Sequence, residues 1–305
     1  MSMSGFLNLN KISGPTSHDI VVKVRESFKE KVKVGHLGTL DPLAEGVLPI
    51  AIGSATRTFP FFLELRKSYS VTMIFGKITG TQDVTGRLIE ENQVPELELS
   101  KCQDFLDKFL GETSQSPPMF SAVNVGGKRL YELARDGIEI DRKKRNIEVF
   151  SIKANSISGP YLEFEVECSR GTYIRTLCHD LGQFQGSGGC MVSLRRTSLG
   201  PFRIENTLSL DDFAALSKSN SMSEVFVSLS DALAHLPLMN FADSEEDRLR
   251  NGITIDCLVE NYDFSENDDF RMLNSRGNLI GIGRVVPGNQ GSSKKMKIRP
   301  IKIFN

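Results

Sequence analysis

One acidic residue in a stretch punctuated by glycine and proline is the first candidate for chemistry. Residues 35–49 place Asp41 between Gly38 and Gly46, directly before Pro42, and then continue into apolar sequence. Glycine permits tight turns and close approach of a ligand, while proline fixes its own φ and biases the preceding residue away from the helical region. A carboxylate held so rigidly beside an apolar wall can act as nucleophile or base, or stabilise developing positive charge. The alternative is that Asp41 only caps its own turn, as aspartate before proline often does.

The composition is that of an ordinary globular protein. The chain has 305 residues, a length that allows one large domain or two. Of these residues 39% are hydrophobic and 25% are charged, which is usual for a globular protein. The longest apolar runs, near residues 47–52 and 59–63, are far shorter than a membrane span, and the N-terminal residues do not have the pattern of a secretory signal. The five cysteines are scattered, without zinc-ligand or redox spacing. We therefore expect a cytoplasmic protein with free thiols and no membrane contact.

The sequence indicates neither a metal site nor a nucleotide cofactor. The four histidines form no cluster with ligand spacing. Residues 281–283 read Gly-Ile-Gly, but Val286 stands where a dinucleotide-binding motif has its third glycine. The Gly-x-x-x-x-Gly-Lys-Ser/Thr phosphate-binding motif is also missing from the sequence. We expect no cofactor and no metal.

Charge is distributed unevenly, although the formal net charge is only −1. Residues 243–269 are strongly acidic, whereas all charged side chains from Arg271 to the end are basic. Two further basic groups precede them, made up of Lys128, Arg129, Arg142, Lys143, Lys144 and Arg145. Clustered bases can bind nucleic-acid phosphates. The plainer interpretation is a solvated face, because such runs are usually just exposed.

Hydrophobic periodicity predicts the elements that must position the Asp41 loop. Thr16 or Ser17 is a typical cap, and apolar residues at helical spacing follow, which predicts a helix over residues 17–30. Alternation predicts strands over residues 69–75 and 161–168. The intervening residues 76–86, rich in glycine, threonine and aspartate, are typical of a loop.

Further helices are expected later in the chain. One should end at Gly111, and another should begin near Ile174 and stop at Gly182. The glycine-rich residues 186–189 are typical of a flexible connection, and residues 208–235 again have a helical pattern.

The pattern changes after Pro237 to short apolar segments separated by turn residues. We therefore place a boundary near residues 236–242, between a first domain of residues 1–236 and a small β-rich domain of residues 242–305.

Six short segments occur in an order that is known from one protein family. Residues 35–49 read Gly-His-Leu-Gly-Thr-Leu-Asp-Pro-Leu-Ala-Glu-Gly-Val-Leu-Pro. The others are Lys-Ser-Tyr at 67–69, a Gly/Thr/Asp pattern at 76–86, Pro-Pro-Met-Phe-Ser-Ala-Val and its continuation at 117–137, Gly-Thr-Tyr-Ile-Arg-Thr-Leu at 171–177 and Leu-Arg-Arg-Thr at 194–197. Together they resemble the tRNA pseudouridine-55 synthase family, the bacterial TruB-type enzymes. The departures are Ile12, where proline is usual, and Leu37, where threonine is common.

The resemblance implies isomerisation of uridine to pseudouridine in the T-loop of tRNA, at position 55, without a guide RNA. The C1′–N1 bond is broken, the uracil turns, and C5 is joined to C1′. The implied fold is α/β of the α+β type, with a mixed, mostly antiparallel sheet, flanking helices and a small PUA-like RNA-binding domain at the C-terminus. We expect a monomer.

The resemblance also implies roles for individual residues. Asp41 would be the essential carboxylate, Arg175 would orient it and keep it ionised, and Tyr69 would stack on the target base or transfer a proton. For Arg175 and Tyr69 the alternatives are a surface arginine and a core tyrosine.

Four more residues would contact the substrate. Tyr173 and Leu194 would complete the apolar walls of the site, and His36 would contact the RNA loop from which the uridine has been turned out. Lys67 would support a phosphate or the pocket wall.

An insertion over residues 117–145 would close over the RNA. Its bases Lys128, Arg129, Arg142, Lys143, Lys144 and Arg145 would contact phosphates, which position RNA without reading its bases. The C-terminal bases would extend this surface toward another part of the tRNA, such as the acceptor stem.

Two rival functions remain open from the sequence. The first is a tRNA-binding or tRNA-folding protein that keeps the scaffold without catalysis. The second is a hydrolase that uses Asp41 together with Glu45, although no second acidic motif supports it.

Overall fold

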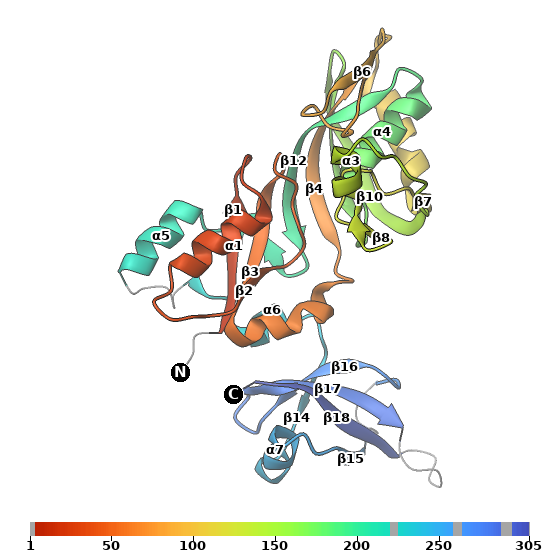
Figure 1. The fold of residues 1–305 in the computed structure, drawn as a ribbon. Helices are drawn as coiled ribbons and strands as arrows, with labels where there is room; N and C mark the ends of the chain where they lie inside the picture. The colour runs from red at the N-terminus through yellow and green to blue at the C-terminus, as the bar shows by residue number, and fades with distance from the viewer. Residues whose placement is uncertain (1–3, 220–224, 259–263, 288–294, 305) are drawn as a thin grey trace.

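The described residues form a nine-stranded sheet, a five-stranded sheet and two short hairpins (Figure 1). The computed structural model describes residues 4–219, 225–258, 264–287 and 295–304. The larger sheet has nine strands, in the order β1 (Gly5–Lys11), β3 (Glu45–Ile52), β12 (Gly189–Leu199), β4 (Lys67–Phe75), β11 (Tyr161–Cys168), β10 (Arg145–Ser158) and β7 (Gly111–Gln115), with β2 (Val34–His36) on β3 and β13 (Phe202–Arg203) on β12. In this sheet only β3 and β12 run parallel, so the predicted mixed, mostly antiparallel sheet is confirmed.

Strand β4 lies at the centre of the large sheet, and alternate side chains on it are apolar. Tyr69, Val71 and Met73 are buried, and the strand pairs with β12 on one side and β11 on the other. The expected strand over residues 161–168 coincides with β11, whose apolar residues face the core while its glutamates face outward.

Helices cover the large sheet (Figure 1). They are α1 (Ser17–Glu26), α2 (Leu99–Leu106), α3 (Leu130–Arg135), α4 (Ile174–Gln185), α5 (Leu210–Lys218) and α6 (Leu229–Ala232), with 3-10 turns η1 (Gly53–Phe62), η2 (Asp107–Phe109) and η3 (Ile204–Asn206). Short hairpins pair β5 (Lys77–Thr79) with β6 (Leu88–Glu91) and β8 (Asn124–Val125) with β9 (Lys128–Arg129).

The predicted helix caps are partly confirmed. Thr16 caps α1 in a reciprocal capping box with Asp19. The helix ends at Glu26 rather than at residue 30, because the chain must reverse to enter β2 antiparallel to β3. Over residues 208–235 the described part contains two short helices, α5 and α6; residues 220–224 lie outside the described residues.

The predicted helix stop at Gly182 is wrong. Helix α4 continues to Gln185 and is capped by Gly186 at φ +102°. Gly182 instead allows α4 to approach β12, since a Cβ at this position would lie 2.1 Å from the Gly189 nitrogen.

The predicted flexible connection at residues 186–189 is held in place. Ser187 is buried, and the Gly188 N–H donates to the Gly182 carbonyl.

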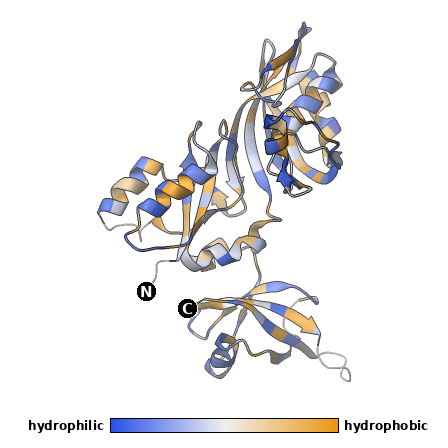
Figure 2. Ribbon diagram, in the orientation of Figure 1, coloured by the Kyte–Doolittle hydropathy of each residue, from blue (hydrophilic) through white to orange (hydrophobic). Residues whose placement is uncertain are grey.

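The C-terminal sheet is the expected β-rich part. Its order is β14 (Leu238–Asn240), β16 (Asp269–Leu273), β17 (Leu279–Pro287), β18 (Lys295–Ile303) and β15 (Ile255–Leu258), with helix α7 (Asp243–Arg250) beside it. Helix α7 holds part of the acidic segment and is mostly hydrophilic (Figure 2). Ile282 and Phe304 join a hydrophobic cluster with Phe6 and Phe62, so this sheet packs on the rest of the chain.

Two negative findings apply to the described residues alone. In the described ranges no helix is both long and apolar enough to cross a membrane. Those ranges also hold no group of three or more side chains suited to a metal ion.

A Gly182→Ala substitution tests the close approach of α4 to β12. Alanine ordinarily favours a helix by about 1 kcal/mol over glycine. Here its Cβ would clash with the Gly189 backbone, so we expect the free energy of unfolding to fall by about 1–3 kcal/mol. Urea unfolding measures this. Gly80→Ala is the control, because no atom lies within 4 Å of its Cβ position; a stabilised Gly182→Ala protein would contradict the packing argument.

Candidate active site

Asp41 lies in the loop between β2 and β3, and the backbone of that loop is fixed from several sides. The Leu40 N–H donates to the Ser17 hydroxyl oxygen over 2.8 Å, and that hydroxyl donates to the Leu40 carbonyl over 3.0 Å. The Gly14 N–H donates to the Pro42 carbonyl over 2.9 Å. The Asp41 side chain is 38% exposed, so the loop presents a carboxylate that a ligand can reach.

Lys11 is a buried cation that the sequence reasoning missed. Its ammonium donates to the carbonyls of Ile12, Pro42 and Ala44 over 3.1, 3.0 and 2.6 Å, and therefore ties the end of β1 to the Asp41 loop. Burial lowers its pKa to about 8, while nearby Asp41 favours the charged form. The sequence pattern that indicates a buried Lys11 is the alternation along the strand, because Lys11 follows the buried Leu7 and Leu9 at intervals of two residues.

Arg175, in the first turn of α4, makes the central contact. Its Nε donates to Asp41 Oδ2 over 2.8 Å. Nη1 donates to the Thr81 carbonyl over 2.8 Å and Nη2 to the Phe120 carbonyl over 2.9 Å. Arg175 is only 4% exposed, so it is a buried arginine with three partners and not a surface residue. The expected pairing with Asp41 is present.

Asp83 is a second acidic residue at this arginine, and the sequence reasoning treated it only as part of a loop. Its Oδ2 lies 3.8 Å from Arg175 Nε, and the residue is 5% exposed. Its Oδ1 accepts from the Thr81 hydroxyl, the Thr85 N–H and the Thr85 hydroxyl over 2.7, 3.0 and 2.5 Å. Residues 81–85 are therefore a rigid turn that holds the Thr81 carbonyl against the guanidinium.

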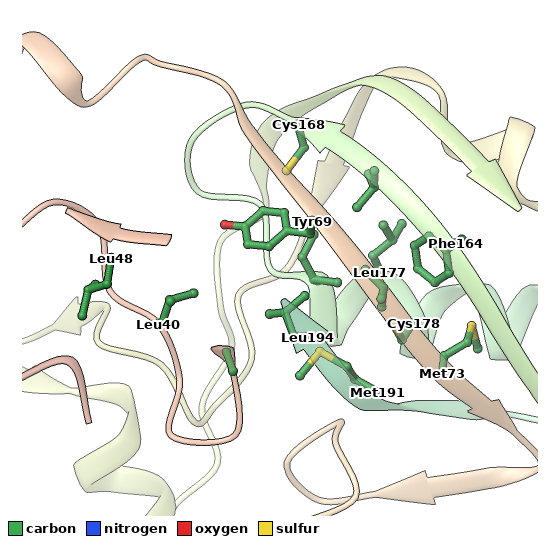
Figure 3. Packing of buried hydrophobic residues seen from close by; sticks show 14 of the residues in the cluster. Leu40, Leu48, Tyr69, Met73, Phe164, Cys168, Leu177, Cys178, Met191 and Leu194 are labelled. Carbon is green, nitrogen blue, oxygen red and sulfur yellow. The ribbon is translucent and has the colours of Figure 1, made fainter. Parts of the chain in front are cut away.

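Tyr69 points from β4 toward the side of Leu40 and Leu48, away from Phe164 and Leu177 (Figure 3). It is 7% exposed. Burial raises the pKa of the phenol to about 12, with the positive charge of Arg196 opposing the rise. The phenol therefore stays protonated at neutral pH.

Arg196 on β12 is a second buried guanidinium beside Tyr69. Its Nε donates to the Val47 carbonyl over 2.7 Å and its Nη2 to the Gly38 carbonyl over 3.0 Å. These contacts span both ends of the Asp41 loop. Burial lowers the pKa of Arg196. The quoted Leu-Arg-Arg-Thr segment contains this residue, but its role could not be read from the sequence.

His36, Lys67 and Leu194 lie close to these groups in the fold. His36 is half-buried at the end of β2, and burial lowers the pKa of its ring, whose Nδ1 has no hydrogen-bond partner among the described residues. Lys67 Nζ donates to the Leu65 carbonyl over 3.2 Å, and burial lowers its pKa as well. Leu194 is 7% exposed and lies opposite Val71 of β4.

Tyr173 is half-buried and occupies the N-cap of α4, two residues before Arg175. Its backbone is held by Gln115 at the end of β7. The structure thus brings Asp41, Arg175, Tyr69 and Tyr173 to the region where the loop before β3, strand β4 and helix α4 meet.

The predicted phosphate-binding bases fall into two groups. Lys128, Arg129, Lys143, Lys144 and Arg145 are exposed. Arg142 is half-buried and donates to the Pro117 carbonyl over 3.3 Å and to Glu139 over 3.2 Å, so it braces the insertion from within.

The C-terminal bases divide in the same way. Arg276 and Arg299 are exposed. Arg284 is bound to Asp269 through two hydrogen bonds of 2.6 and 2.8 Å, and Arg271 donates to the carbonyls of Leu236 and Ser230. Arg284 and Arg271 of this basic segment are therefore already bound to other groups of the protein.

The chain is similar in sequence and in fold to known proteins. Residues 25–174 match the model of the TruB family pseudouridylate synthase N-terminal domain, and residues 175–236 match that of the tRNA pseudouridylate synthase B C-terminal domain. The chain is 44% identical to tRNA pseudouridine synthase B of Syntrophomonas wolfei, over 99% of both chains. It is also 44% identical to that of Geobacter sulfurreducens, over 82% of both chains. A solved Cbf5-Nop10-Gar1 complex contains a chain that is 28% identical, with a TM-score of 0.76, over 98% of this chain and 84% of that one.

A Lys11→Met substitution tests whether the buried ammonium fixes the Asp41 loop. Methionine fills similar space but removes the ammonium donor from three carbonyls, of which Pro42 keeps the Gly14 N–H, so we expect the free energy of unfolding to fall by about 1–3 kcal/mol. Urea unfolding measures the change. Lys67→Met, which removes a single carbonyl contact, should have a smaller effect. Equal stability of Lys11→Met and the parent protein would refute the role assigned to Lys11.

Proposed function

This chain belongs to the TruB family of tRNA pseudouridine synthases and is an isomerase that acts on uridine in tRNA; we propose that its target is the uridine at position 55, in the T-loop, and that Asp41 is the catalytic carboxylate. The observation that supports this proposal most strongly is the ion pair of Asp41 with the buried Arg175.

That ion pair suits a reaction at a glycosidic carbon. Arg175 holds Asp41 Oδ2 in a fixed direction, and a preorganised charge stabilises a transition state without reorganisation at the moment of reaction. The carboxylate is still 38% exposed and can meet a uridine that has been turned out of its loop. In the proposed isomerisation the C1′–N1 bond breaks, C5 bonds to C1′, the C5 proton is lost, and N1 gains one. Reactant and product have the same atoms and the same oxidation state.

Tyr69 and the other neighbours would hold the uridine against Asp41. The Tyr69 phenol is protonated, so it would act as an aromatic surface and hydrogen-bond donor rather than as a phenolate. Tyr173 and Leu194 would complete the apolar walls. His36, whose Nδ1 has no hydrogen-bond partner among the described residues and whose pKa is lowered by burial, would contact the displaced RNA loop. Lys67 supports the Leu65 carbonyl and would shape the wall.

We propose that the enzyme binds the T-arm of tRNA as a monomer and needs no guide RNA. Exposed bases on the insertion, Lys128 and Arg129 among them, would contact phosphates of the T-arm. The exposed Arg276 and Arg299 of the C-terminal sheet would reach another part of the tRNA, such as the acceptor stem.

The rival functions have less support. Family membership and the intact Asp41–Arg175 pair favour an enzyme over a purely tRNA-folding protein. A hydrolase that pairs Asp41 with Glu45 is disfavoured, because the Asp41 carboxylate is bound to Arg175 whereas Glu45 is exposed.

An Asp41→Asn substitution tests the proposed catalytic role. Asparagine keeps the shape but removes the charge, so pseudouridine formation in a T-arm stem-loop transcript should fall by about 10³-fold or more, while RNA binding stays within about threefold. Nucleoside analysis after digestion measures the product.

Glu45→Gln is the control for the carboxylate-pair mechanism, and it should retain product formation. Loss of activity in Glu45→Gln together with survival of Asp41→Asn would contradict the assignment. Pseudouridine formation at a uridine other than position 55 would contradict the proposed target alone.

A combined Lys128→Ala and Arg129→Ala variant tests the proposed phosphate contacts. Loss of two exposed charges should weaken T-arm binding and reduce the slope of log K against log salt by about 2. Arg142→Ala should change the slope less, because Arg142 is bound within the insertion. Filter binding at several salt concentrations measures both. An unchanged slope in the double variant would remove these two residues from the interface.

A further inference from the structure

Gln115 makes a two-sided contact with the backbone of a residue in the candidate active site. It is the last residue of β7 and is 4% exposed. Its Nε2 donates to the Tyr173 carbonyl over 3.0 Å, and its Oε1 accepts from the Tyr173 N–H over 2.8 Å. One carboxamide thus contacts both backbone polar groups of Tyr173, whose carbonyl also accepts from the Leu177 N–H over 3.0 Å within the helix.

The contact falls where helix α4 begins. Tyr173 is the N-cap of α4, with φ −95° and ψ 108°, and its own side chain caps no N–H of the helix. The position of the cap residue fixes where the first turn starts, and Arg175 lies in that turn. Gln115 therefore acts on both the Tyr173 ring and the Arg175 guanidinium through one backbone segment.

The same contact joins the site to the insertion over residues 117–145. Gln115 stands directly before this insertion, and the carbonyl of Phe120 within it accepts from Arg175 Nη2 over 2.9 Å. The base of the RNA-binding insertion and the start of α4 are thus linked at two points. A shift of one segment would displace the other.

We propose that Gln115 is a positioning residue for the uridine isomerisation. It holds Tyr173 and Arg175 in the geometry that orients Asp41. The proposal rests on the proposed function. Gln115 takes no part in bond making. It acts on the reaction through the backbone of Tyr173 and the guanidinium two residues later.

Gln103 provides a matched control, because it makes the same type of contact elsewhere. Its Oε1 accepts from the Ala154 N–H over 2.7 Å and its Nε2 donates to the Ile152 carbonyl over 3.2 Å. It joins α2 to β10, its Nε2 also donates to Asp107 Oδ1 over 2.7 Å, and among the described residues it forms no hydrogen bond with Asp41, Arg175 or Tyr173. Gln103→Ala and Gln115→Ala therefore remove similar bonds in different places.

The experiment compares single-turnover pseudouridine formation, T-arm affinity and urea unfolding for the two variants. We expect Gln115→Ala to lower the single-turnover rate constant by about tenfold or more, because displacement of a positioning segment by about 1 Å can lower a rate about 10²-fold. T-arm affinity should stay within about threefold. Gln103→Ala should leave the rate constant within about twofold, even if it destabilises the fold as much.

A Gln115→Glu variant keeps the proposal testable should Gln115→Ala not fold. The glutamate retains an acceptor for the Tyr173 N–H but has no donor for the Tyr173 carbonyl, so we expect the same loss of rate. Equal rate constants in Gln115 and Gln103 variants would overturn the proposal. It would also be overturned if the whole effect appeared in affinity, or if neither Gln115 variant folded while Gln103→Ala did. An inactive parent protein would instead overturn the proposed function.

Discussion

Burial of the Arg175 guanidinium is the constraint that organises this molecule. A charged group removed from water is unfavourable unless it has charged or polar partners, and here three different segments provide them. The Asp41 carboxylate and the carbonyls of Thr81 and Phe120 each accept one of its donors. Each of these segments must therefore lie against the start of α4, and the Asp41 side chain is still 38% exposed while it is held there.

The strand order of the large sheet also fixes the position of the Asp41 loop. The single parallel pairing in the large sheet, between β3 and β12, brings Arg196 beside the strand that follows the Asp41 loop. Arg196 then spans from Gly38 to Val47, and Lys11 binds Pro42 and Ala44 from β1. The buried cations Lys11 and Arg196 thus bind backbone carbonyls of the loop and of the start of β3. The Asp41 side chain is bound by Arg175 instead.

Local patterns predicted much of the fold, because they depend on neighbouring residues. The strand over residues 161–168 and the Thr16 cap are examples. Pairing of Asp41 with Arg175, which lie 134 positions apart, followed only from the family resemblance. Gly182 was misread because a glycine that ends a helix and one that admits a neighbouring strand look alike in sequence. Gln115 gave no signal, since its partners are backbone atoms.

The most direct test is a crystal structure of this protein bound to a T-arm RNA that carries 5-fluorouridine at position 55. We expect this nucleotide to be turned out of its loop, with its C1′ facing Asp41, its ring against Tyr69, and Arg175 still bound to the carboxylate. A nucleotide 55 that remains stacked within the RNA, with its C1′ away from the Asp41 carboxylate, would contradict this assignment.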